Sequence, residues 1–276
     1  MPVKEKTRLW LWLGLGVGGA LLVTAAVLIL LLSKPEPTPP EPSTAGTTEA
    51  TLPENPLKPE DFGYQGDYLT CLTRESVLGI DVSYHQKEID WQQVKDAGVE
   101  FVMLRLAYRG SIEGALSTDI MAQQNYEGAK AAGLKIGGYI FTQSINPQEG
   151  REDAAYVLDI VNGWELDMPL VYDWEVMDPS YRNANLDPRT LTDTMLAFCQ
   201  AIEAAGYDAM VYFNPSQARV NFYPTELTDY GFWLANYAET LNYPHKVDMW
   251  QYTCTGRVPG IKGNVDIDLY FPPEEE

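Results

Sequence analysis

The sequence has few of the side chains that most often bind metal ions or nucleic acids. Its 276 residues include only three cysteines and two histidines, too few for a zinc site built from Cys and His ligands. Basic residues are also scarce, with 19 Lys and Arg against 39 Asp and Glu and a net charge of −20. This charge repels phosphate backbones, so nucleic acid is not expected as a partner. Any chemistry is therefore expected to depend on carboxylates, amides and aromatic side chains, with no metal and no cofactor.

The composition is otherwise that of a folded protein. Hydrophobic residues make up 45% of the chain, aromatic residues 12% and charged residues 21%, which excludes wholesale disorder. The length also suits an α/β barrel of about 250 residues that folds as one domain.

A segment of 23 residues without a charge runs from Trp10 to Leu32. As a helix it would span roughly 34 Å at about 1.5 Å per residue, enough to cross a bilayer. Three basic residues precede it and one follows closely, so the positive-inside rule places residues 1–9 in the cytoplasm and the rest outside the cell membrane. The alternative is a cleaved signal peptide, whose apolar region is usually shorter, about 7 to 15 residues, and ends at a small-x-small site.

A linker is expected to follow this signal anchor, over residues 33–60. Residues 35–60 contain eight prolines and six Ser or Thr, and few apolar residues. Proline favours the polyproline II conformation at about 3.1 Å per residue, so this stretch could reach roughly 80 Å when extended. The linker would hold a domain of residues 61–276 away from the membrane.

Short apolar runs alternate with amphipathic segments from residue 77 onward, a pattern typical of βα units in a parallel sheet. Three further strands follow with turn-rich connections. Eight strands in all predict a closed but irregular barrel, in which functional residues collect at the carboxyl ends of the strands. Strands are expected at 77–82, 101–107, 134–141, 169–176, 208–214, 231–237, 247–253 and 264–270, and helices at 90–98, 118–132, 149–162 and 188–205.

Four acidic residues fall near those strand ends. Asp173 and Glu175 are two residues apart on one strand and are expected to point to the same face, with Trp174 turned outward. Closing the barrel pairs the last strand with the first and brings Asp266 beside Asp81. Crowded carboxylates raise the pKa of at least one member, which can then donate a proton at neutral pH. Each acid alone has an ordinary structural explanation, and only their coincidence at one mouth points to catalysis.

Aromatic and amide side chains are expected near the same mouth. Aromatic faces pack against the C–H faces of sugars, and hydroxyl and amide groups bind sugar hydroxyls. Tyr172 and Trp174 are expected in the core, and His85 and His245 in loops. Either core packing or sugar binding could be the role of the four remaining candidates, which are Tyr139, Tyr212, Trp233 and Gln251.

Five segments resemble the glycoside hydrolase family 25 lysozymes, the Chalaropsis-type N-acetylmuramidases. The resemblance covers nearly all of residues 77–271 in order, and it implies an irregular (β/α)5β3 barrel. It also implies cleavage of the β-1,4 bond between N-acetylmuramic acid and N-acetylglucosamine in peptidoglycan. The segments are GIDVSYHQKEIDW at 79–91, GGYIFTQ at 137–143, LVYDWE at 170–175, FWLANY at 232–237 and MWQYTCTGRVPGIKGNVDIDLY at 249–270.

The resemblance assigns roles to the four acids. Glu175 matches the family's proton donor, and Asp173 matches the residue that assists it, for example by orienting the 2-acetamido group of the substrate. Asp81 matches the acid of the family's opening motif, and Asp266 matches the closing acidic residue. Whether hydrolysis retains or inverts the anomeric configuration stays open, because the spacing of the carboxyl groups does not follow from the spacing of the strand positions.

Two positions depart from the family pattern. Ile140 stands where the family often has His, and Asp268, which is expected to lie in a turn, stands where the family has Asn. A non-catalytic wall-binding module on the same barrel is the alternative function, although binding alone needs no crowded acids. A metal-dependent deacetylase would need a His-rich site that two histidines cannot form.

The cysteines permit one disulfide. Cys71 precedes the first barrel strand and Cys254 follows a late one, so barrel closure could bring them together in an oxidising exterior. Cys199 lies in an apolar helical pattern and is expected to be a buried small hydrophobe.

Overall fold

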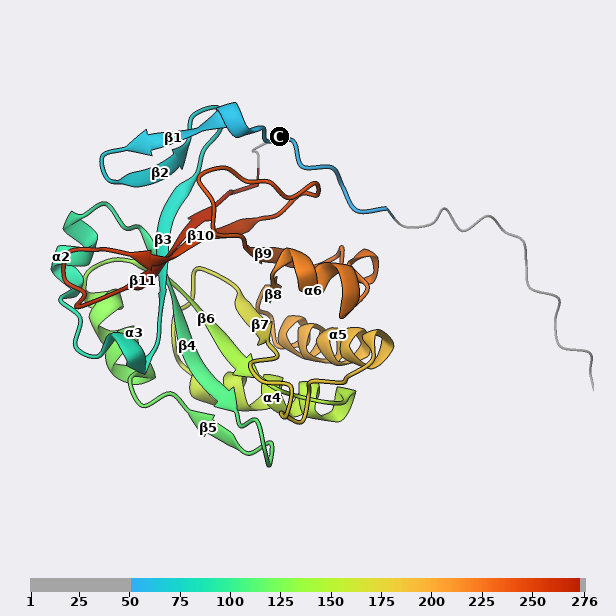
Figure 1. Ribbon diagram of the computed structural model, residues 1–276. Coiled ribbons are helices and arrows are strands. Elements are labelled where there is room, and N and C mark those ends of the chain that lie inside the picture. The colour runs from blue at the N-terminus through green and yellow to red at the C-terminus, as the bar shows by residue number, and fades with distance from the viewer. Residues whose placement is uncertain (1–50, 274–276) are drawn as a thin grey trace, which may run out of the picture. The chain divides into compact units, whose positions relative to one another are not determined.

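The structure is a computed structural model that describes residues 51–273 (Figure 1). The expected membrane segment at 10–32 and most of the expected linker lie outside the described residues. Within 51–273, no helix combines the length and the apolarity that crossing a bilayer requires.

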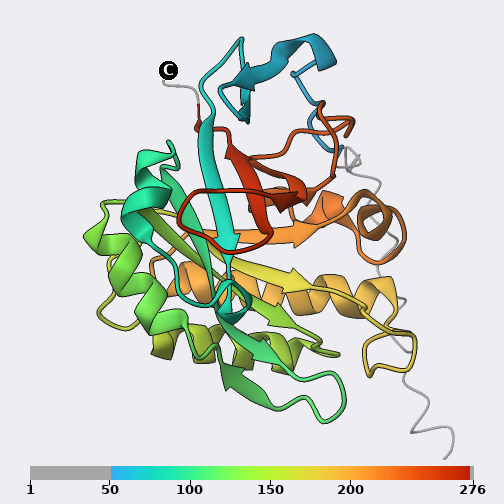
Figure 2. The ribbon, with the colours of Figure 1, turned by 60° about the vertical axis from the view of Figure 1, so that its left-hand side comes forward.

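Eight strands form the closed barrel that the sequence predicts. Neighbours pair in parallel from the first of these strands to the seventh. The last strand runs antiparallel to both of its neighbours and closes the barrel against the first (Figure 2). In barrel order the strands are β3 (Val77–Val82), β4 (Phe101–Arg109), β6 (Lys135–Thr142), β7 (Leu170–Trp174), β8 (Ala209–Phe213), β9 (Gly231–Ala235), β10 (Met249–Gly256) and β11 (Val265–Tyr270).

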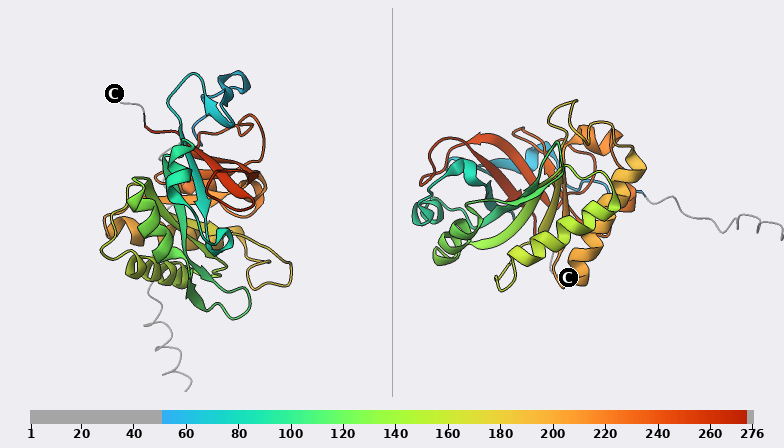
Figure 3. Two further views of the ribbon diagram at one scale, coloured as in Figure 1. Left: turned by 90° about the vertical axis from the view of Figure 1, so that its left-hand side faces the viewer. Right: turned by 90° about the horizontal axis from the view of Figure 1, so that it is seen from below.

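Five helices follow the first five barrel strands, which gives the expected (β/α)5β3 order. Four begin after an Asp or Asn whose side chain accepts a hydrogen bond from a backbone N–H of the first turn, which fixes where the helix starts. The two longest, α4 and α5, pack against each other outside the barrel (Figure 3). The helices are α2 (Trp91–Asp96), α3 (Ala122–Ala131), α4 (Pro147–Ile160), α5 (Pro188–Ala204) and α6 (Pro215–Val220).

Side chains alternate between the two faces of the barrel strands, and each face contributes to a separate hydrophobic core. One face packs against the helices, and there Tyr172 and Trp174 are buried as predicted, with 0% and 1% of their surface exposed. The other face fills the lower barrel with side chains such as Phe101 and Met103. Gly79 makes room for this interior, because a Cβ there would lie 2.1 Å from the Phe101 ring. The inward positions nearer the carboxyl ends of the parallel strands include polar side chains.

Several short elements were not predicted. A hairpin of β1 (Phe62–Gln65) and β2 (Tyr68–Cys71) precedes the barrel, and β5 (Leu116–Thr118) extends β4 as an antiparallel edge. Three single-turn 3-10 helices also occur, at Pro59–Asp61, Tyr84–Gln86 and Pro224–Glu226.

The last part of the expected linker is held against the barrel domain. The Asn55 N–H donates to the Pro244 carbonyl, and the Lys246 N–H donates to the Pro53 carbonyl. The Asn55 side chain donates to the Tyr243 carbonyl. The chain is therefore attached to the domain several residues before residue 61.

The predicted bridge between Cys71 and Cys254 is wrong, since both are free thiols in the structure. The hairpin turns Cys71 into the core, where it is 7% exposed, whereas Cys254 is exposed on β10. Cys199 is fully buried in α5, as expected.

Candidate active site

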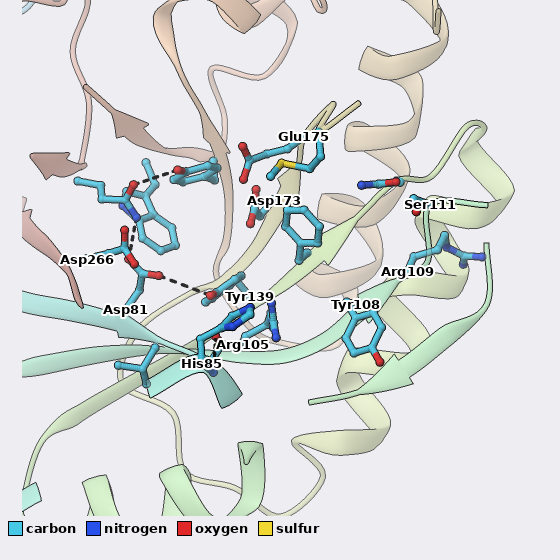
Figure 4. A pocket seen from close by; sticks show the side chains of 18 of the residues that line it. Asp81, His85, Arg105, Tyr108, Arg109, Ser111, Tyr139, Asp173, Glu175 and Asp266 are labelled. Atoms are coloured by element: carbon cyan, nitrogen blue, oxygen red, sulfur yellow. Dashed lines mark hydrogen bonds between the residues drawn. The ribbon is translucent and has the colours of Figure 1, made fainter. Parts of the chain in front are cut away.

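A pocket of about 650 Å³ lies at the carboxyl ends of the parallel barrel strands (Figure 4). The four predicted acidic residues and the four predicted binding residues all line it, although they come from seven different strands and one strand end. Among residues 51–273, no group of three or more His, Cys, Asp or Glu side chains is arranged to hold a metal ion. The eight residues are Asp81, Tyr139, Asp173, Glu175, Tyr212, Trp233, Gln251 and Asp266.

Strand β7 carries two of the acids. Asp173 lies in the strand and Glu175 follows its last residue, so both side chains reach the pocket while Trp174 turns into the outer core. Asp173 is 6% exposed and Glu175 is half-buried. Neither carboxyl group has a hydrogen-bond partner among the described residues, which leaves both free to meet a ligand.

Two buried amides hold the backbone at this point. The Gln217 Nε2 donates to the carbonyl of Trp174 at 2.8 Å, and the Asn183 Nδ2 donates to the carbonyl of Glu175 at 2.8 Å. Sequence reasoning missed both residues, because each lies in a connection beyond a strand and neither carries a charge. Together they fix the direction in which Glu175 leaves the strand.

Closure of the barrel places Asp266 directly opposite Asp81, as predicted. The two are paired positions of the antiparallel strands β11 and β3. Because β11 runs opposite to the other strands, its first residues lie at the end where the parallel strands finish. A residue near the start of the last strand therefore joins residues near the ends of the others.

A hydrogen-bond network holds Asp81. Its Oδ2 accepts from the Gln251 Nε2 at 2.7 Å, and its Oδ1 accepts from the Tyr139 hydroxyl at 3.5 Å. The Gln251 Oε1 accepts in turn from the hydroxyls of Tyr212 and Tyr237, both at 3.0 Å. Three of the predicted binding residues thus position Asp81 and one another.

Asp268 does not lie in a turn, so that expectation was wrong. It is fully buried on β11, two residues after Asp266 and on the same inward face, and its Oδ1 accepts from the Trp233 Nε1 at 2.9 Å. Burial, and then the charge of Asp266, raises the pKa of Asp268 well above its usual range. The barrel therefore encloses a fifth carboxyl group beneath the pocket.

The acids raise one another's pKa values. Burial raises the pKa of Asp81, Asp173 and Glu175, and the negative charge of Asp266 adds to the shift in all three. Burial also raises the pKa of Asp266, to about 6. The pocket therefore holds carboxyl groups that keep protons at a pH where exposed carboxyls have lost them.

Arg105 is a cation in the lining of the pocket that sequence reasoning missed. Its charge lowers the pKa of Asp173, against burial and the repulsion of Glu175. The alternation of side chains along β4 could have predicted this position. Phe101 and Met103 both point into the barrel interior, and Arg105 occupies the next inward position.

Known proteins are similar to this chain in sequence and in fold. The profile of glycosyl hydrolases family 25 matches residues 80–261. The chain is 30% identical to the autolytic lysozyme of Clostridium acetobutylicum over 198 residues, which are 70% of this chain and 55% of that protein. It is 32% identical to lysozyme M1 of Streptomyces globisporus over 205 residues, 69% of this chain and 66% of that one.

A solved structure is also similar to this chain in fold. The modular autolysin LytC of Streptococcus pneumoniae, in complex with a synthetic peptidoglycan ligand, superimposes with a TM-score of 0.63 at 26% identity. The match covers 71% of this chain and 47% of LytC, so the chain spans about half the length of that protein, as it does of the clostridial lysozyme. Because the matching profile extends from β3 almost to β11 and includes three of the four pocket acids, the chain belongs to glycosyl hydrolases family 25.

Proposed function

We propose that the chain is a muramidase that hydrolyses the β-1,4 bond between N-acetylmuramic acid and N-acetylglucosamine in peptidoglycan. The observation that carries this proposal is the convergence of Asp81, Asp173, Glu175 and Asp266 on one pocket with raised pKa values. A protonated carboxyl beside ionised ones is what general acid catalysis at a glycosidic bond requires. Two relatives named as lysozymes, and an autolysin solved with a peptidoglycan ligand, support the choice of substrate.

In the proposed mechanism, Glu175 donates its proton to the glycosidic oxygen as the bond from that oxygen to the anomeric carbon breaks. Asp173 stabilises the positive charge that develops on the sugar, or orients its acetamido group, and Arg105 favours the ionised form that this role needs. Asp266 keeps the pKa of Glu175 high. Water completes the hydrolysis, and the configuration of the new reducing end distinguishes direct attack by water from assistance by the acetamido group.

Digestion of purified peptidoglycan tests the proposed bond. Muropeptides released by the protein, reduced with borohydride and analysed by mass spectrometry, are expected to end in reduced N-acetylmuramic acid. Reduced N-acetylglucosamine at the ends would identify a glucosaminidase instead. Sedimentation of the protein with peptidoglycan, without any released product, would favour the wall-binding module.

We also propose that residues 10–32 anchor the barrel to the outside of the cell membrane, where it would remodel or turn over the wall of its own cell. The support is the uncharged length of this segment and the excess of basic residues before it. Protease added to intact spheroplasts is expected to release the barrel and leave residues 1–32 with the membrane. A mature protein whose N-terminus lies after residue 30 would show a cleaved signal peptide and contradict the anchor.

A further inference from the structure

A second, smaller hollow adjoins the acidic pocket. It has a volume of about 330 Å³ and is lined by Tyr84, Arg105, Tyr108, Ile120 and Phe141. Arg105, Tyr108 and Phe141 also line the acidic pocket, so the two hollows share a wall. In Figure 4, Arg105 and Tyr108 lie below Asp173 and Glu175. The second hollow is therefore next to the place where a sugar bound beside those acids would lie.

The second hollow differs from the first in chemistry. Its lining is aromatic and aliphatic except for Arg105, and it includes Ile120, which is 84% exposed although it is apolar. No acidic residue lines it. On a chain with a net charge of −20, this lining offers an anionic and partly apolar ligand one cation, apolar walls and no acid.

A carboxylate and two aromatic rings hold the Arg105 guanidinium in place at this hollow. Its Nε donates to the Asp119 Oδ2 at 2.8 Å, and its Nη groups have no acceptor among the described residues, although the side chain is only 11% exposed. The rings of Tyr84 and Tyr108 lie 4.9 and 5.7 Å from the guanidinium carbon. Stacking fixes the plane of the guanidinium. Its Nη2 is buried, so Nη1 is the N–H group that it offers to a carboxylate in the hollow.

Asp119 fixes the surrounding wall as well. Its Oδ2 also accepts from the backbone N–H of Tyr84 at 3.1 Å, and its Oδ1 accepts from the N–H of Met121 at 2.9 Å. This buried carboxylate therefore positions Arg105, the turn that carries Tyr84 and the residue after Ile120. These contacts hold this part of the wall in place before a ligand binds.

We propose that the second hollow binds the peptide carried by the muramic acid residue of the substrate, with Arg105 pairing with a carboxylate of that peptide. The inference rests on the proposed function, because the acidic pocket must bind the glycan strand for its substituent to reach this hollow. In peptidoglycan the lactyl group of muramic acid bears a short peptide with both alanyl methyl groups and free carboxylates. The methyl groups suit the aromatic and aliphatic wall, and the carboxylates suit Arg105. The enzyme would accordingly prefer glycan strands that keep their peptides.

Two forms of one substrate test this preference. Soluble, uncross-linked strands with intact peptides are compared with the same strands after an amidase has removed the peptides and the lactyl carboxylates exposed by that cleavage have been converted to amides. The wild-type protein is expected to show a kcat/KM roughly tenfold higher on the peptide-bearing strands, the scale of one good pocket contact. Ile120→Asp should bring this ratio close to one, because the new carboxylate competes for Arg105 and makes the apolar wall polar. Val220→Asp is the matched control, since Val220 is exposed on α6 and lines neither hollow.

The outcomes separate the two proposals. Activity of Ile120→Asp on stripped strands shows that the variant is folded, so a fall in the ratio reports on the peptide alone. Equal ratios for the wild type, Ile120→Asp and Val220→Asp would overturn the peptide site and leave the muramidase intact. A wild-type protein that cleaves neither form would overturn the proposed function, and this inference with it.

Discussion

Glu175→Gln is expected to slow peptidoglycan hydrolysis by about 10² to 10⁴, the usual contribution of one general acid. Glutamine keeps the size of the side chain and its place beside Asp173, but it has no acidic proton to give to the glycosidic oxygen. The Glu175 carboxyl has no hydrogen-bond partner among the described residues, and a backbone carbonyl, not this carboxyl, accepts from Asn183. The substitution should therefore leave the fold unchanged and remove only the proton transfer.

The measurement is the rate of release of reducing ends from purified peptidoglycan, with circular dichroism to confirm folding. Glu203→Gln is a matched control, because Glu203 is an exposed residue of α5 outside the pocket. A folded Glu175→Gln protein that hydrolyses peptidoglycan as fast as the control would assign the acid to another residue of the cluster.

Arg109→Met is expected to lower the free energy of unfolding by about 3–5 kcal/mol at neutral pH, because it leaves a buried charge without its partner. Arg109 is 5% exposed, and its Nε donates to the Oδ1 of Asp153, which is fully buried. Its Nη1 donates to the Gly114 carbonyl at 2.7 Å. The hydroxyls of Thr142 and Ser144 donate to the Asp153 Oδ2 but carry no compensating charge.

The loss of stability should depend on pH. Burial already raises the pKa of Asp153 despite the donors around it, and removal of the Arg109 charge raises it further. The folded variant then binds a proton at a pH where the unfolded chain, with an Asp pKa near 3.9, has released it. Stability conferred by a raised pKa falls as pH rises, so the deficit relative to wild type should grow from pH 5 to pH 8.

Urea unfolding at the two pH values measures this deficit. Arg219→Met serves as the control, since Arg219 is exposed on α6. An Arg109→Met deficit no larger than that of the control at pH 8 would show that the buried pair contributes nothing to stability.

Much of the barrel was predictable because its strands are apolar runs bounded by turn residues. The first barrel strand has the predicted bounds, Val77–Val82. The short elements carried weaker signals. Helix α6 has an Asn214 cap, with Pro215 at the first helical position and Gln217 completing the capping box, but six residues are too few to show a helical period. The β1–β2 hairpin turns at Gly66, which has φ +65°, between strands of only four residues.

The acids of the site were predictable for a related reason. Alternation along β7 and closure of the barrel fix which way Asp173, Glu175, Asp81 and Asp266 point, and neither depends on details of packing. The hydrogen-bond partners of the site residues, in contrast, depend on the registers between strands that are far apart in the sequence.

The contact between Trp233 and the buried Asp268 illustrates such dependence. It joins β9 to β11 across the interior, past the strand between them, and no local pattern in the sequence reports it. The free cysteines have the same cause, because the orientation of the β1–β2 hairpin decides where Cys71 points.

The antiparallel insertion of β11 between β10 and β3 has a consequence for biosynthesis. A ribosome produces β11 after every other barrel strand, so a nascent chain already contains Glu175 while Asp266 is still missing. The first and last strands then meet by closing a very long loop, which is a slow step in folding. Asp266, whose charge raises the pKa of Asp81, Asp173 and Glu175, therefore joins the other acids only in this final docking step.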